Sequence, residues 1–155
     1  GFSLEKLYEL SEGMEFLDQL QDFMKDFFDA DFVIGHNVQF DIKFLKHELN
    51  SLYEVGMIDE TWEPKNSFCT MTYYKNICNI PAPRGNGIKN PKLSEVIDFL
   101  NISQDKIATK ANELFQGSGN YHDARFDTAA AYLLVIEGIK QKYIKPGFFS
   151  EQLKK

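Results

Sequence analysis

Two short segments of the chain place a histidine and an aspartate around the expected start of a helix. The first, HNVQFD, contains His36, Asn37 and Asp41 and follows a short apolar run. The second, HDARFD, begins at His122 and ends at Asp127 after a Gly-Ser-Gly-Asn turn. The helix dipole favours ionised carboxylates in a first turn, and carboxylate oxygens are ligands of hard divalent cations. A nearby histidine can accept a proton at neutral pH, so both segments suit metal-assisted hydrolysis.

The apolar periodicity predicts the elements that would hold these segments. The apolar run 32–35 and the segment 67–70 are expected as strands, and residues 81–91, with three of the five prolines, as a surface loop. Helices are expected at about 4–10, 14–28, 37–52, 71–79, 92–100, 104–115 and 123–142. Two short strands are few for a sheet beside so many amphipathic helices. The prediction is therefore an α/β chain in which either the helices pack on one another or further strands complete the sheet.

Composition limits the class of protein. A chain of 155 residues that is 43% hydrophobic can form one domain with a core, and no run of 18 apolar residues predicts a membrane span. We expect no membrane partner. The two cysteines, Cys69 and Cys78, lack metal-ligand spacing and are expected as free thiols in a reducing compartment, which favours the cytoplasm.

Charge is distributed unevenly along the chain. The net charge of −6 argues against a protein that holds nucleic acid by bulk electrostatics. Residues 1–60 carry 14 acidic and 4 basic side chains, whereas residues 61–155 carry 9 and 13. Two interpretations stay open: solvated helix faces, or a basic strip that follows a phosphate backbone beside an acidic metal pocket.

Taken together, the two segments resemble motifs of a known family, the DEDDh 3′–5′ exonucleases, which includes polymerase proofreading subunits and oligoribonucleases. The second family motif is His-Asn-x-x-Phe-Asp and the third is His-x-x-x-x-Asp, and both match here at each defining position. The strand-like VIGHN and the helix-like PKLSEVIDFLNI also fit. The resemblance implies an RNase H-like exonuclease fold, with residues 1–145 as the C-terminal two-thirds of the domain and 146–155 as a tail.

The resemblance also implies roles for individual residues. Asp127 and Asp41 would hold two metal ions, Mg²⁺ or Mn²⁺, and His122 would accept the proton of the attacking water. The residues that would line the site and steady the 3′-terminal nucleotide are His36, Asn37 and Phe40. The basic residues of the loop that would guide the phosphates of the nucleic-acid strand are Arg84, Lys89 and Lys92.

One family feature is missing. The first motif, Asp-x-Glu on an opening strand, supplies two more metal ligands, and these 155 residues contain no such strand. The adjacent pair Asp59-Glu60 lies between the two matched motifs and is no substitute. The strands that carry this motif are expected before Gly1, so residues 1–155 in isolation are expected to show little or no nuclease activity.

The expected function is metal-dependent 3′–5′ exonuclease action on single-stranded DNA or RNA ends, with DNA favoured in a proofreading or repair role and a DNA polymerase or helicase as a further partner. The alternative is a non-catalytic module that keeps the scaffold and binds nucleic acid or protein. A third interpretation is a helical interaction module in which both motifs are coincidental. Three aromatic residues that could stack on bases, Trp62, Tyr73 and Tyr74, are expected in the core instead.

Overall fold

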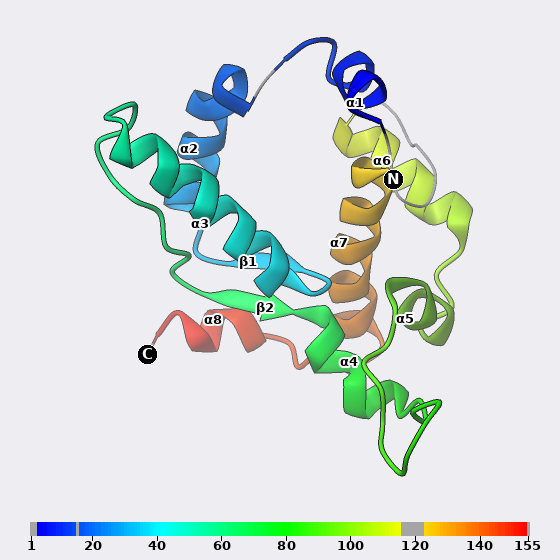
Figure 1. The fold of residues 1–155 in the computed structure, drawn as a ribbon. Helices are drawn as coiled ribbons and strands as arrows, with labels where there is room; N and C mark the ends of the chain where they lie inside the picture. The colour runs from blue at the N-terminus through cyan, green and yellow to red at the C-terminus, as the bar shows by residue number, and fades with distance from the viewer. Residues whose placement is uncertain (1–2, 15, 116–122, 155) are drawn as a thin grey trace.

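The computed structural model describes residues 3–14, 16–115 and 123–154, and in these it confirms the α/β class (Figure 1). The elements, in order, are α1 (Leu4–Leu10), the 3-10 helix η1 (Phe16–Gln19), α2 (Leu20–Asp29), β1 (Val33–Gly35), α3 (Val38–Glu54), β2 (Ser67–Cys69), α4 (Thr70–Cys78), α5 (Leu93–Phe99), α6 (Gln104–Phe115), α7 (Ala124–Lys140) and α8 (Phe148–Gln152). The expected helix 14–28 is thus divided between η1 and α2. None of the described helices is both long enough and apolar enough to cross a bilayer.

The two strands form a small parallel sheet. Val33 pairs with Ser67 and Gly35 with Cys69, so the strands end at the same edge. A parallel pair needs a crossover connection, which α3 provides between β1 and β2. Because β1 leads into α3 and β2 leads directly into α4, the starts of both helices meet at the carboxyl edge of the sheet.

One part of the core packs α2 against α3 and the loop that follows α3. The buried residues of this cluster are Leu20, Val38, Ile42, Leu49, Ile58 and Trp62. The phenylalanines of α2 cover it, with the rings of Phe23 and Phe27 stacked at 4.1 Å. The Trp62 indole N–H donates to the Phe27 carbonyl oxygen over 3.1 Å, which confirms the expected core position of this tryptophan.

The second part of the core surrounds α7. Tyr74 is fully buried, as expected, and its hydroxyl donates to the Leu134 carbonyl oxygen over 2.9 Å. Tyr73 is half-buried against the same cluster. The helices α5 and α6 flank α7 on one side of the sheet, whereas α2 and α3 lie on the other side in Figure 1. The sheet is therefore covered by helices from both halves of the chain.

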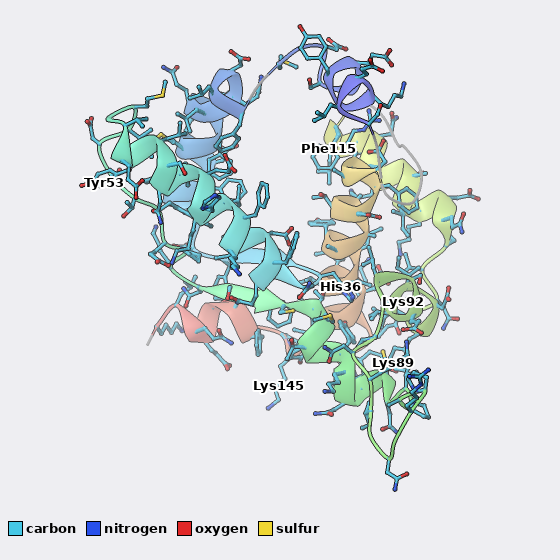
Figure 2. The ribbon with its side chains drawn as sticks, in the orientation of Figure 1. His36, Tyr53, Lys89, Lys92, Phe115 and Lys145 are labelled. Atoms are coloured by element: carbon cyan, nitrogen blue, oxygen red, sulfur yellow. The ribbon has the colours of Figure 1, made fainter. Side chains whose placement is uncertain are left out.

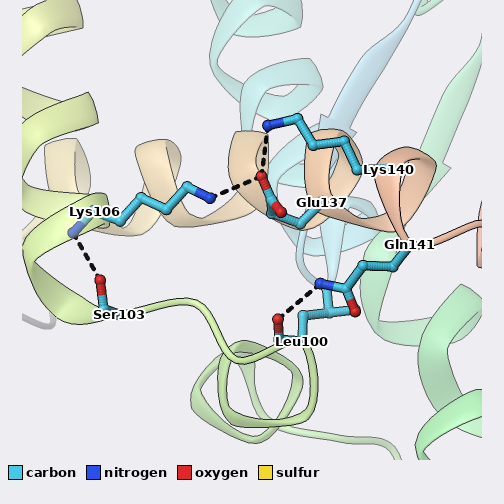
Figure 3. Close-up of polar contacts among 6 residues, drawn as sticks. All are labelled: Leu100, Ser103, Lys106, Glu137, Lys140 and Gln141. Carbon is cyan, nitrogen blue, oxygen red and sulfur yellow. Dashed lines mark hydrogen bonds and ion pairs between the residues drawn. The ribbon is translucent and has the colours of Figure 1, made fainter.

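Polar contacts fix α5 and α6 against the end of α7 (Figure 3). The Glu137 carboxylate accepts from Lys106 of α6 and from Lys140 of α7, each over 2.9 Å. The Gln141 amide donates to the Leu100 carbonyl oxygen at the end of α5 over 2.9 Å. Since the Glu137 side chain is only 12% exposed, these two bonds neutralise a carboxylate that would otherwise be costly to bury.

The sequence of the tail from Pro146 leads us to expect a loosely packed segment. No residue of α8 is fully buried, but the two phenylalanines of this helix contact the sheet, which the sequence did not predict. Residues of α8 pack on β2, with Phe148 and Phe149 ring centroids 5.4 and 5.1 Å from that of Phe68. Edge-to-face aromatic contacts of this kind add to the gain from apolar burial. The short, isolated helix carries too little periodicity to be identified from sequence, although its two phenylalanines were a signal of burial.

Replacing Gly138 by alanine should destabilise the protein strongly. A β-carbon at this position would lie 2.1 Å from the Tyr74 hydroxyl oxygen and 3.0 Å from Ile144 Cδ1. Because Tyr74 is fully buried, its ring cannot move without breaking the bond to Leu134, and the expected loss is about 1–3 kcal/mol of unfolding free energy or more. Urea denaturation measures it. Gly87→Ala, where no atom lies within 4 Å of the new carbon, is the matched control, and equal losses in both variants would contradict this packing.

Candidate functional site

The turn between β1 and α3 is made by Asn37 in a left-handed conformation. Its φ and ψ are 73° and 37°, a region that asparagine tolerates better than most residues. Asn37 occupies the N-cap position of α3, but its side chain makes no capping hydrogen bond. The exposed amide is therefore left at the surface, where it could contact a ligand.

His36 connects three segments that meet at this edge of the sheet, in the position labelled in Figure 2. Its Nε2 lies 3.0 Å from the Pro91 carbonyl oxygen and its Nδ1 3.0 Å from the Thr70 hydroxyl. A carbonyl oxygen only accepts, so Nε2 carries a hydrogen. Burial lowers the pKa of His36, and the bond to Pro91 opposes this more weakly. Both nitrogens thus join β1 to α4 and to the segment before α5, and contact with a nucleotide stays a prediction.

Asp41 lies in the first turn of α3, as expected. It lines a shallow hollow of about 310 Å³ together with Phe40, Phe44 and Leu45. Partial burial in this apolar setting raises the pKa of Asp41, against a smaller lowering by its own backbone N–H. Phe40 is 66% exposed and Asp41 is also exposed, so both the ring and the carboxylate are accessible to a ligand.

The second segment lies at the start of α7. Asp127 is in the first turn of α7 and half-buried, whereas His122 lies outside the described residues. The helix is capped by Asp123, whose carboxylate accepts from the backbone and side chain of Arg125. These bonds lower the pKa of Asp123 to about 2. Sequence reasoning missed this capping pair, although an aspartate just before a helix is a standard N-cap signal.

Asp41 and Asp127 lie on different helices, α3 and α7, that pack on the two-stranded sheet. Asp41 follows β1 closely. Asp127 lies on α7 eight residues before Val135, and Val135 is the residue of α7 that packs near Phe68 of β2. Eight residues correspond to about 12 Å along a helix axis. Within residues 3–14, 16–115 and 123–154, no group of three or more His, Cys, Asp or Glu side chains could hold a metal ion. The described part of the chain therefore supplies at most a partial ligand set.

The loop at 81–91 is closed by an antiparallel bridge between Pro81 and Ile88. Lys89 pairs with the Glu95 carboxylate, which also accepts from the Lys92 backbone N–H over 2.7 Å. The charge of Lys89 is thus already balanced within the chain. Arg84 is exposed in the part of the loop between Pro81 and Ile88, and a role for these residues in guiding phosphates stays a prediction.

Cys69 lies where the starts of α3 and α4 meet, a feature that sequence reasoning missed. Burial is the largest single influence and raises the pKa of its thiol. Hydrogen bonds from the side chain and backbone of Thr72 and from the N–H groups of Asn37 and Val38 outweigh this, so the pKa is lowered overall. The Thr72 hydroxyl is 3.4 Å from the sulfur. Thr72 reaches the sulfur from the first turn of α4, whereas the parallel pairing of β1 and β2 brings the Asn37 and Val38 donors to it, and no local sequence pattern shows that pairing.

The chain matches no described protein family, no curated protein and no solved structure. The family resemblance therefore rests on the sequence segments described above.

The two cysteines should differ in reactivity. Hydrogen-bond donors around the Cys69 sulfur outweigh its burial and lower the pKa of this thiol. Burial, with a smaller contribution from the charge of Glu95, raises the pKa of Cys78. Alkylation by iodoacetamide, followed by mass spectrometry as a function of pH, should give a midpoint below about 9 for Cys69 and above it for Cys78. Thr72→Val removes one donor and should raise the Cys69 midpoint alone. Coincident midpoints in the wild-type protein would contradict this geometry.

His36 should make stability depend on pH. Because its pKa is lower in the folded than in the unfolded chain, its contribution is complete above about pH 6.5 and is lost as pH falls through the folded pKa. The free energy of unfolding, measured by urea denaturation between pH 5 and 7.5, should fall on acidification. Its slope against pH should be at most that expected for the uptake of one proton. His36→Gln should remove this slope, whereas replacement of the exposed His47 by glutamine should keep it. An unchanged slope in His36→Gln would refute the assignment.

Proposed function

We propose that the chain forms the C-terminal part of a DEDDh-type 3′–5′ exonuclease domain of RNase H-like fold, which hydrolyses single-stranded nucleic-acid ends with the help of Mg²⁺ or Mn²⁺. One observation carries the proposal. The HNVQFD segment lies at the carboxyl edge of a parallel sheet, the edge at which α/β proteins bind their ligands, and its aspartate is in the first turn of the following helix. The HDARFD segment also puts its aspartate in a first turn.

In this proposal Asp41 and Asp127 bind the metal ions, whose positive charge assists hydrolysis of the terminal phosphodiester. His122 takes the proton of the attacking water. Asn37 and Phe40, both exposed, contact the 3′-terminal nucleotide. His36 would act chiefly by holding the β1–α3 turn in place, because both of its nitrogens are engaged within the chain.

The proposal requires further acidic ligands, since the described residues hold only part of a metal site. The Asp-x-Glu motif of the family, on strands that extend the two-stranded sheet, would supply them from outside residues 1–155. The favoured substrate is DNA, in a proofreading or repair role beside a polymerase or helicase. The two free cysteines fit a reducing compartment such as the cytoplasm.

Among the described residues the ligand set is only partial, and this favours a second candidate, a non-catalytic module that keeps the exonuclease scaffold and binds nucleic acid or protein. This candidate keeps the nucleotide-facing residues Asn37 and Phe40 but does not need Asp41 and Asp127 as metal ligands. The two candidates differ in whether replacing these aspartates abolishes hydrolysis.

Nuclease activity is the test, with the protein in the full length in which it is encoded. A single-stranded DNA oligonucleotide labelled at its 5′ end should shorten from the 3′ end in Mn²⁺ or Mg²⁺ and stay intact in EDTA. Asp127→Asn should lower the rate by at least about 100-fold, because an interaction with the reacting phosphate worth about 2.7 kcal/mol is lost.

Asp59→Asn is the matched control, because Asp59 is exposed and lies outside both motifs, and it should keep full activity. Binding of the oligonucleotide without any metal-dependent shortening would favour the non-catalytic module instead. Cleavage at internal positions, or equal loss in both variants, would contradict the proposed site.

A further inference from the structure

The solvent side of α3 carries two kinds of residue in adjacent stripes. With about 100° of rotation per residue, one stripe is polar and contains Gln39, Lys43, Lys46, His47 and Asn50. The next stripe consists of Phe40 and Phe44, which are 66% and 59% exposed. The acidic residues Asp41 and Glu48 lie beyond the phenylalanines. Aromatic rings and basic side chains are thus neighbours on the solvent-facing side of the helix. Asp41 and Glu48 lie on the other side of the rings, and Glu54 falls in the polar stripe at the far end of α3.

The polar stripe borders a hollow. Its volume is about 400 Å³, and its lining residues are Gln39, Ile42, Lys43, Lys46, His47 and Asn50. Lys46 is paired with Glu63. The side chains of Lys43 and His47 make no hydrogen bond or ion pair to another residue that the structure describes, so their donors are available to a ligand. No acidic residue lines this hollow, which favours an anion as its occupant.

The two exposed phenylalanine rings indicate that the anionic ligand also carries flat, apolar groups. Phe40 and Phe44 are one helical turn apart, and a second, apolar hollow adjoins them. Leaving two large rings in water has a free-energy cost that a stacked, flat ligand would relieve. A phosphate alone cannot use these rings, whereas unpaired bases joined by phosphates can use both stripes together. Base stacking on aromatic side chains beside a basic groove is how proteins hold single strands without reading their sequence.

We propose that the outer face of α3 is a binding surface for single-stranded nucleic acid. Bases stack on Phe40 and Phe44, and the phosphates lie along Lys43 and His47. The helix runs away from the sheet edge, from the His36 end to Tyr53 in Figure 2, so the strand would extend from the site along α3. The inference rests on the proposed function for its class of ligand, but it needs neither metal nor hydrolysis.

The experiment is fluorescence anisotropy of labelled single-stranded 12-mers of deoxythymidine and of uridine, with the 155-residue chain in EDTA. Binding of either strand is expected to weaken at least about fivefold in Phe44→Ala, which removes one stacking ring, and in Lys43→Glu. The slope of log affinity against log salt should also become shallower in Lys43→Glu. The affinities measured for the two oligonucleotides show whether this face of α3 prefers DNA or RNA.

Matched controls lie off the face. Lys25→Glu on α2 changes the same charge, and Tyr132→Ala on α7 removes a ring that is 45% exposed, and neither should change the affinity. Loss in Lys43→Glu without loss in Phe44→Ala would overturn the proposal, because the face would then be an anion site only. Equal loss in Lys25→Glu, no binding to either strand, or a dimer in sedimentation that Phe44→Ala dissociates would also overturn it.

This design separates the two proposals. If binding follows α3 but the encoded protein shows no metal-dependent shortening, the proposed catalytic function fails and the binding surface stands. If shortening occurs and depends on Asp127, but the affinity for the oligonucleotide is unchanged in Phe44→Ala and Lys43→Glu, the catalytic function stands and the α3 binding surface fails.

Discussion

The parallel pairing of β1 with β2 is the contact on which the arrangement of this chain depends. It joins segments more than thirty residues apart and brings the starts of α3 and α4 to one edge. His36 and Cys69 occupy that edge and form hydrogen bonds with the polar groups that meet there. A three-residue strand pair is weak alone. Its stability therefore comes from the side chains around it, from Phe68 and the α8 phenylalanines on one side to the α2–α3 cluster on the other.

Helix α7 is the second constraint. It is the most buried helix among the described elements, and its contacts with Tyr74, Ile144 and α6 hold the C-terminal half together. The absence of a side chain at Gly138 is what lets the Tyr74 hydroxyl reach the α7 backbone. Asp127 sits at the start of this rigid helix, so its position is set by packing along α7 and is not free to follow the sheet edge.

The sequence allowed prediction of the elements whose signal is local. Helical spacing of apolar residues located α3 and α7 to within about two residues, and a short apolar run before Asn37 located β1. The positions of Asp41 and Asp127 in first turns followed from these. The remaining features depend on contacts between distant segments: the bonds of His36 to Thr70 and Pro91, the Asn37 and Val38 donors beside Cys69, and the packing of the α8 phenylalanines on Phe68. No periodicity within one segment encodes such contacts.

The central claim is that the β1–α3 turn and the start of α7 serve one metal site. Titration of the ¹⁵N-labelled protein, in the full length in which it is encoded, with paramagnetic Mn²⁺, followed by NMR, tests it most directly. The account predicts that amide signals of the first turns of α3 and α7 broaden together at the lowest Mn²⁺ concentrations, and that Asp127→Asn removes the broadening at both. Broadening around Asp41 that persists unchanged in Asp127→Asn would contradict it, because the two aspartates would then bind ions independently.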